Sequence, residues 1–153
     1  LANRRAFQKD GEALLARAKQ EGFSVALLYL DLDRFKPVND TYGHEMGDIL
    51  LQKVAIRLKE TLRATDLLAR IGGDEFVVLL HSIHASEDAD SVAGKIRQVL
   101  AQPLRLDGHS LIIQTSIGVA RYPDHGTEEK QLFRHADEAM YAAKRQHHQR
   151  LGA

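Results

Sequence analysis

Residues 67–80 read LLARIGGDEFVVLL, and the fold and the function of the chain both depend on this stretch. Two apolar runs, residues 67–71 and 76–80, flank two glycines and two carboxylates, which predicts a β-hairpin with a charged turn. We call residues 72–75 the acidic tip. Glycine adopts positive φ without a Cβ penalty and lets a backbone or a phosphate come close, and carboxylates are ligands for hard cations. The same tetrapeptide is also ordinary turn chemistry, so the rest of the chain must separate a plain turn from a site.

The composition is that of a soluble globular protein of one-domain size, with 153 residues, 44% hydrophobic and 27% charged. Cysteine is absent, which excludes disulfides, thiolate metal sites and a cysteine nucleophile. Basic and acidic residues number 21 each, so no net field draws the chain to nucleic acid. Because no apolar stretch approaches ~20 residues and no signal peptide opens the chain, we expect a cytoplasmic segment without membrane contact. This expectation is compatible with a membrane tether elsewhere in the full-length protein.

Helical spacing of apolar residues predicts four helices. Asn3 is expected to cap the first helix, which Gly22 ends. A polar connection over residues 34–48 precedes the second helix. The apolar face of that helix is Leu50, Val54, Leu58 and Leu62. The third helix is expected over residues 86–101, and Thr127 is expected to cap the last. The core face of the last helix is Leu132, Phe133, Ala136, Met140 and Ala143.

The strand patterns complete the predicted fold. Residues 24–30 form a continuous apolar run that ends in Asp31-Leu32-Asp33, which predicts a strand buried on both faces with an acidic exit. Asp107-Gly108 predicts a hairpin turn, and alternation from residue 111 to 119 predicts a late strand closed by Tyr122-Pro123. The order α-β-α-ββ-α-ββ-α predicts an α/β (α+β) fold with a central mixed, mainly antiparallel sheet covered by helices. We expect residues 1–153 to form a single domain cut from a longer multidomain protein.

Carboxylates gather at two of the predicted strand ends. Asp31 and Asp33 follow one strand, and Asp74 and Glu75 connect two others. A metal-dependent nucleotide-transfer site needs two or three carboxylates on rigid elements, so that two ions ~3.5–4 Å apart can hold the attacking and leaving oxygens. These side chains meet only if the strands are neighbours in the sheet, and ordinary acidic turns remain the alternative.

The polar connection carries groups that suit a guanine base. Asp48 can accept from the N1–H and the amino group of guanine, while the Asn39 amide both donates and accepts. Adenine does not satisfy the same carboxylate. His44 lies between them as a ligand contact or, more commonly for a lone histidine, as an ordinary loop residue.

Several spaced motifs together resemble the GGDEF domain family, whose members are diguanylate cyclases. The resemblance covers nearly the whole chain and follows the family's motif order. The motifs are LANRRAF (1–7), DLDRFK (31–36), NDTYGH (39–44), GD (47–48), GGDEF (72–76), TSIGVA (115–120) and ADEAMYAAK (136–144). The resemblance implies the nucleotidyl cyclase/polymerase palm fold. It also implies a transferase reaction in signal transduction, which joins two GTP molecules into the bacterial second messenger cyclic di-GMP and releases two pyrophosphates.

The resemblance implies a role for each matching residue. Asp31, the backbone carbonyl of Leu32, Asp74 and Glu75 are expected to hold two Mg²⁺ or Mn²⁺ ions per active site. Asp74 and Glu75 are the expected catalytic residues, with Glu75 as candidate base for the 3′-hydroxyl of GTP. The expected substrate-binding residues are Phe35 and Gly73 near the phosphates, Lys36 and Lys144 on the phosphates, Asn39 and Asp48 on guanine, and His44 lining the nucleotide pocket.

The resemblance also implies a dimer and its control. Each domain holds one GTP, so catalysis is expected to need an antiparallel homodimer. Arg63-Ala64-Thr65-Asp66 matches the family's RxxD inhibitory product site, and Arg63 and Asp66 suit the phosphate and guanine of cyclic di-GMP. The four residues alone also fit a helix-terminal arginine followed by a turn aspartate. Further expected partners are a regulatory sensor domain and a phosphodiesterase domain elsewhere in the full-length chain.

One departure from the family concerns the phosphate end. After Lys144 the family usually continues with two variable residues and Gly-Arg-Asn, whereas residues 145–149 read RQHHQ. His148 therefore replaces an arginine that normally contacts phosphate, and a neutral imidazole is a weaker electrostatic partner. This favours, as the alternative function, a module that binds GTP or cyclic di-GMP as a regulatory domain with weak turnover. A purely structural dimerisation domain would not need four acidic residues at strand exits.

Overall fold

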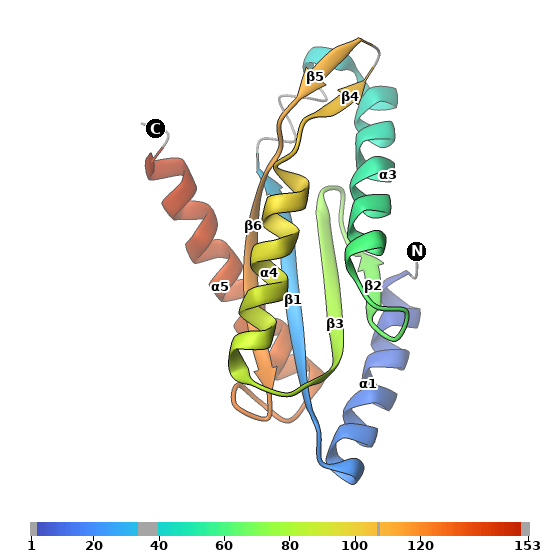
Figure 1. The fold of residues 1–153 in the computed structure, drawn as a ribbon, viewed down its shortest axis with the longest axis vertical. Coiled ribbons are helices and arrows are strands. Elements are labelled where there is room, and N and C mark those ends of the chain that lie inside the picture. The colour runs from blue at the N-terminus through green and yellow to red at the C-terminus, as the bar shows by residue number, and fades with distance from the viewer. Residues whose placement is uncertain (1–2, 34–39, 107, 151–153) are drawn as a thin grey trace.

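The computed structural model describes residues 3–33, 40–106 and 108–150, with side chains described as far as residue 146. The described helices and strands follow the predicted order, except that three described strands instead of two lie between the last two helices (Figure 1). They are α1 (Arg4–Glu21), β1 (Ser24–Asp33), α3 (His44–Thr61), β2 (Leu67–Arg70), β3 (Glu75–Ile83), α4 (Ser86–Leu100), β4 (Leu104–Leu106), β5 (His109–Leu111), β6 (Gln114–Tyr122) and α5 (Glu129–Arg150). None of the described helices combines the length and the apolar character needed to cross a bilayer.

Four strands form the main sheet in the order β2-β3-β1-β6, and each described pair is antiparallel. The predicted hairpin on either side of the acidic tip is therefore confirmed as β2 and β3. The hairpin at Gly108 is also present, but β4 and β5 form a separate two-stranded sheet beside the start of α3 (Figure 1). The strand predicted from residue 111 begins only at Gln114, because its pairing with β1 starts there, opposite Asp33.

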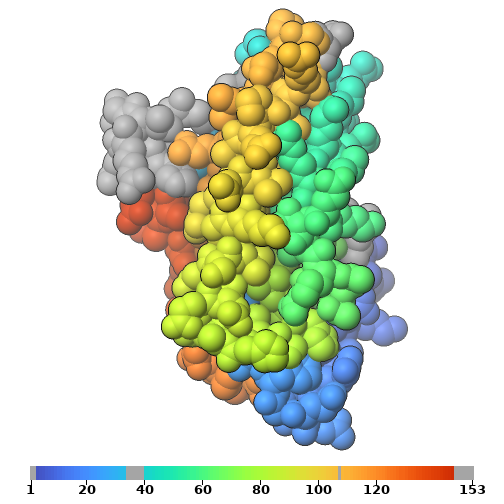
Figure 2. Space-filling view, viewed as in Figure 1, coloured from blue at the N-terminus to red at the C-terminus, as the bar shows by residue number. Residues whose placement is uncertain are grey.

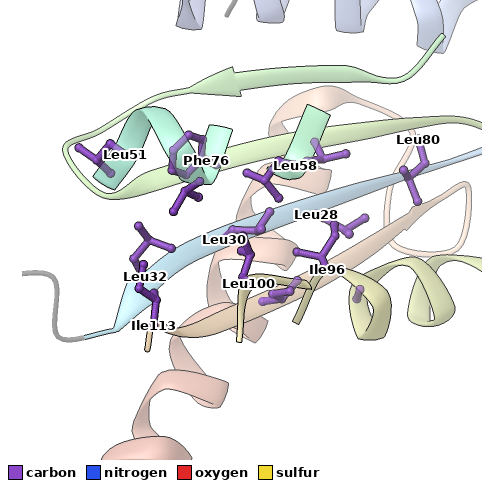
Figure 3. Close-up of a cluster of buried hydrophobic side chains, with 14 of the residues drawn as sticks. Leu28, Leu30, Leu32, Leu51, Leu58, Phe76, Leu80, Ile96, Leu100 and Ile113 are labelled. Atoms are coloured by element: carbon purple, nitrogen blue, oxygen red, sulfur yellow. The ribbon is translucent and has the colours of Figure 1, made fainter. Parts of the chain in front are cut away.

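The sheet lies between two layers of helices. Figure 2 shows α3 and α4 side by side over one face, and α1 and α5 cover the other face. Leu28, Leu30 and Leu32 of β1 point into the cluster under α3 and α4 (Figure 3). Tyr29 belongs to the cluster under α1 and α5, as the two-residue period of a strand requires. The strand is thus buried on both faces, as predicted, and it continues through the buried Asp33 instead of ending at Leu30.

Helix boundaries agree with the sequence in part. Asn3 accepts a 2.8 Å hydrogen bond from the backbone N–H of Ala6, and Gly22 ends α1 with φ of 78°. The second helix begins earlier than predicted, because residues 44–48 form its first turn. Thr127, the predicted cap of the last helix, lies two residues before α5, which begins at Glu129. Within the first turn, Oε1 of Gln131 accepts from the backbone N–H groups of residues 127 and 128 at 2.9 and 3.2 Å.

Candidate active site

The acidic tip reaches the end of β1 through the pairing of β1 with β3. Asp31 lies directly opposite Glu75 in this antiparallel pair, and the backbone N–H of Leu32 donates to the carbonyl oxygen of Asp74 at 3.1 Å. The condition set by the sequence is therefore met, because the two strands that carry the carboxylates are neighbours. Asp31, Asp74 and Glu75 come together at one end of the sheet.

Asp31 is a buried carboxylate with one satisfied oxygen. Its side chain accepts a 2.8 Å hydrogen bond at Oδ2 from Nζ of Lys144, which lies on α5. Its Oδ1 is buried and has no hydrogen-bond partner among the described residues. Burial raises the pKa of Asp31 and the charge of Asp74 raises it further, whereas the hydrogen bond from Lys144 lowers it. Burial lowers the pKa of Lys144, but the hydrogen bond and charge of Asp31 outweigh this effect and raise it.

Asp33 occupies the next position on the same face of β1. The Ser116 hydroxyl on β6 lies 2.9 Å from both Asp33 carboxylate oxygens. Asp33 and Ser116 are 5% and 0% exposed, so this contact is part of the protein interior. It fixes the strand end that carries Asp31.

Glu75 is held by a residue that the sequence reasoning missed. The Tyr29 hydroxyl donates a 2.6 Å hydrogen bond to Oε2 of Glu75. Tyr29 precedes Asp31 by two residues, so strand periodicity alone places both side chains on one face of the sheet. Asp137 on α5 is a further carboxylate near Glu75. Its pKa is raised mainly by burial and next by the charge of Glu75.

The backbone of the acidic tip is tied to β2. The guanidinium Nε of Arg70 donates to the carbonyl oxygens of Gly72 and Gly73, at 3.1 and 3.2 Å. Gly73 is exposed and Asp74 is half-buried. A predicted phosphate contact at Gly73 is therefore sterically open.

The chemistry of the carboxylate group suits a divalent cation. Asp31 Oδ1 is a buried carboxylate oxygen, and within the described part of the chain it accepts no hydrogen bond. Burying such an oxygen is costly unless a donor or a cation satisfies it. Mg²⁺ and Mn²⁺ prefer oxygen ligands, and the nearby Asp74 and Glu75 supply them. As the side chains lie, no three histidine or carboxylate groups within the described part of the chain surround a common point. Glu75 is turned toward Tyr29, and Asp31 toward Lys144.

The predicted base-recognition residues lie only partly in the described regions. Phe35, Lys36 and Asn39 fall outside the described residues. His44 and Asp48 lie one helical turn apart at the start of α3, and both are exposed. Their contact with guanine stays a prediction.

Arg63 and Asp66 form an ion pair just after the end of α3. The Asp66 side chain is 2% exposed, and that of Arg63 is 55% exposed. Asp66 Oδ1 accepts from the backbone N–H of His81 at 2.9 Å and from Nη2 of Arg63 at 3.1 Å. Its Oδ2 accepts from the backbone N–H of Arg63 at 2.9 Å and from Nε at 3.3 Å. Nη2 of Arg63 also donates to the carbonyl oxygen of His81.

A cavity of about 430 Å³ adjoins the pair, between α1, α3 and β2.

The family model described as "Diguanylate cyclase, GGDEF domain" matches residues 1–150. The chain belongs to the GGDEF domain family. The bifunctional diguanylate cyclase/cyclic di-GMP phosphodiesterase MucR of Pseudomonas aeruginosa is 42% identical over 146 residues, which cover 95% of this chain and 21% of MucR. Diguanylate cyclase TpbB of the same species is 42% identical over 147 residues, which cover 95% of this chain and 34% of TpbB. The chain thus spans about a fifth to a third of the length of these curated relatives.

Solved structures agree with this assignment. The crystal structure of the TpbB GGDEF domain from P. aeruginosa matches with a TM-score of 0.93 and 41% identity, over 95% of this chain and 91% of that chain. The GGDEF domain of DgcB from Caulobacter crescentus, solved in complex with c-di-GMP, matches with a TM-score of 0.84 and 32% identity, over 95% of this chain and 86% of that chain. The predicted family and the palm-like α/β fold with its antiparallel sheet are confirmed.

Proposed function

We propose that this GGDEF domain is a metal-dependent diguanylate cyclase that acts as a homodimer and condenses two GTP molecules into cyclic di-GMP. One observation carries the proposal: Asp31 lies opposite Glu75 at a strand end, and one buried oxygen of Asp31 has no hydrogen-bond partner among the described residues. A plain acidic turn does not require such a buried carboxylate. The cyclase names of MucR and TpbB and the ligand of DgcB support the same activity.

The carboxylates and the backbone of Leu32 have different roles in the proposed reaction. The 3′-oxygen of each GTP forms a bond to the α-phosphorus of the other GTP, and the bond from that phosphorus to pyrophosphate breaks. Asp31, Asp74 and Glu75, with the backbone of Leu32, would hold Mg²⁺ or Mn²⁺, which supplies charge neutralisation at the phosphates when bound. Glu75 is the candidate acceptor of the 3′-hydroxyl proton.

Lys144 has a second partner in this scheme. Its ammonium pairs with Asp31 at 2.8 Å, and the Lys144 side chain is 30% exposed, so solvent reaches part of it. An incoming triphosphate is a stronger acceptor than one carboxylate already shared with a metal, because it carries several charges. We expect Lys144 to move from Asp31 to the phosphates when the nucleotide binds.

Cyclic di-GMP is the proposed inhibitor at Arg63 and Asp66. The cavity beside Arg63 and the exposed guanidinium support a phosphate contact there. Inhibition in the micromolar range corresponds to about −8 kcal/mol of binding. An Arg63→Ala variant that is inhibited as strongly as the wild type would contradict this assignment.

The test of the function is a product assay. The domain, dimerised at high concentration or by a fused dimerisation segment, is incubated with GTP and Mg²⁺ while pyrophosphate and cyclic di-GMP are measured. We expect two pyrophosphates for each cyclic di-GMP, and a loss of at least about a hundredfold in Asp74→Asn. Asp90→Asn, at an exposed position on α4, is the matched control and should keep full activity.

The assay also separates the alternative function. If the dimerised wild-type domain binds GTP but releases no pyrophosphate, the cyclase proposal is wrong and a regulatory nucleotide-binding module is favoured. If Asp74→Asn is as active as Asp90→Asn, the carboxylate group is not the reaction centre.

A further inference from the structure

The Tyr29 hydroxyl is the described hydrogen-bond donor to the Glu75 side chain, 2.6 Å from Oε2. Tyr29 is only 9% exposed, and its ring packs edge-on against Phe133 of α5 at 5.9 Å between centroids. A buried aromatic ring in such a contact has little freedom to swing away.

The other oxygen of Glu75 is confined by a glycine. A Cβ atom placed on Gly72 would lie 2.9 Å from Oε1 of Glu75 and 3.6 Å from its Cδ. Such a separation is shorter than real Cβ contacts, so the carboxylate occupies space that only glycine leaves open. Tyr29 and Gly72 therefore bound the carboxylate from two sides.

The surrounding charges oppose this position of Glu75. Asp31 lies opposite it in the β1–β3 pair, and Asp137 of α5 is close enough for the two charges to interact. Like charges at short range favour a side chain that turns toward solvent. A donor at Oε2 is what offsets the repulsion.

We propose that Tyr29 is a positioning residue, which holds the Glu75 carboxylate in one rotamer beside Asp31. The inference rests on the proposed function for its catalytic consequence, since Glu75 is the candidate base and metal ligand. The rotamer of Glu75 depends on the chain's own side chains, so it can be measured without metal or nucleotide.

Tyr29→Phe removes only the hydroxyl and keeps the ring against Phe133. Tyr122→Phe is the matched control, because Tyr122 is also 9% exposed and belongs to the same apolar cluster, but lies on β6. The first measurement is the set of three-bond NMR couplings of the Glu75 side chain in the metal-free domain. We expect one rotamer in the wild type and in Tyr122→Phe, and rotamer averaging in Tyr29→Phe.

The second measurement is cyclic di-GMP formation by the dimerised proteins. We expect kcat of Tyr29→Phe to fall by about ten- to a hundredfold, with KM for GTP changed less than about twofold. A single Glu75 rotamer in Tyr29→Phe, or a kcat equal to that of Tyr122→Phe, overturns the proposal. If Tyr29→Phe does not fold, the couplings of the wild-type domain still decide, because rotamer averaging of Glu75 with the Tyr29 hydroxyl in place overturns the proposal.

The Glu75 couplings test the role of Tyr29, and the product assay tests the cyclase function, so the two proposals can fail independently. A wild-type domain without product contradicts the proposed cyclase function. In that case the couplings still decide the position of Glu75, because averaging in Tyr29→Phe supports the role of the hydroxyl and a single rotamer overturns it.

Discussion

At the residue scale, the Asp66 side chain, the predicted guanine acceptor, is buried and hydrogen-bonded within the chain. Both of its carboxylate oxygens already accept hydrogen bonds from the chain, including those from the backbone N–H groups of Arg63 and His81. A buried carboxylate with four donors around it organises the backbone between α3 and β3. Arg63, whose side chain is exposed, is the more accessible member of the pair.

This division predicts different costs for the two substitutions. Asp66→Ala leaves the His81 N–H without its partner and should lower the free energy of unfolding by about 2–3 kcal/mol. Arg63→Ala removes a half-exposed ion pair and should cost less than about 1 kcal/mol. Urea unfolding of both variants, followed by circular dichroism, measures the difference. An Asp66→Ala variant that loses no more stability than Arg63→Ala would contradict this structural role of the Asp66 hydrogen bonds.

Glu129 is the second residue with an unusual environment. It begins α5, is 9% exposed, and its Oε2 is buried without a partner among the described residues. Burial, aided by the charge of Glu12 on α1, raises its pKa from the ordinary 4.5 to about 7. The folded protein therefore binds a proton at Glu129 that the unfolded chain releases near pH 4.5.

The stability should depend on pH through this group. The contribution of Glu129 is complete below pH 4.5, and it is lost as the pH rises through about 7, up to about 3 kcal/mol. The variant Glu129→Gln cannot ionise and should lack this loss between pH 5 and pH 8. Glu128→Gln, at the exposed neighbouring position, is the control and should behave like the wild type. The measurement is the free energy of unfolding at both pH values, and an identical pH dependence in Glu129→Gln contradicts the assignment.

At the scale of elements, α5 approaches β6 so closely that Gly118 has no room for a side chain. An added Cβ would lie 1.9 Å from the carbonyl oxygen of Ala136 and 2.3 Å from the nitrogen of Met140. Both are backbone atoms, so no rotamer change relieves the overlap. The helix that carries Lys144 is positioned over the sheet by this contact.

Gly118→Ala should therefore destabilise the domain by about 3 kcal/mol or more. Gly94→Ala is the matched control, because Gly94 lies within α4 and an added Cβ meets no heavy atom within 4 Å. Helix propensity predicts that the control gains up to about 1 kcal/mol. Chemical denaturation measures both, and a Gly118→Ala variant as stable as the control would be incompatible with the close packing of α5 on β6.

The elements that the sequence predicted well are those with local signals. The cap of α1, the period of β1 and the hairpin around the acidic tip each depend on a few neighbouring residues. The start of α3 at His44 was missed, because Gly43 and Gly47 resemble loop residues although one precedes the helix and the other is buried inside it. Asp31 and Glu75 lie on strands that are distant in the chain. The sequence therefore predicted their contact only on the condition that the two strands are neighbours in the sheet.

At the scale of the whole molecule, the two helical layers serve the site differently. The layer of α3 and α4 buries one apolar face of the sheet, whereas α5 covers the other face and also brings Lys144 to Asp31. The contact of Lys144 with Asp31 spans 113 residues, and no local pattern predicts it. Each chain supplies one such carboxylate group, while the proposed reaction consumes two GTP molecules.

The activity should therefore depend on protein concentration. If each chain activates one GTP, the active species is a dimer, and below its dissociation constant the rate of pyrophosphate release rises with about the second power of protein concentration. A fused dimerisation segment makes the second chain intramolecular and should return the order to about one. Initial rates over a dilution series, with sedimentation velocity on the same samples, measure both. A constant rate per chain in samples that sediment as monomers would show that one domain completes the reaction, and the requirement for two facing copies would be wrong.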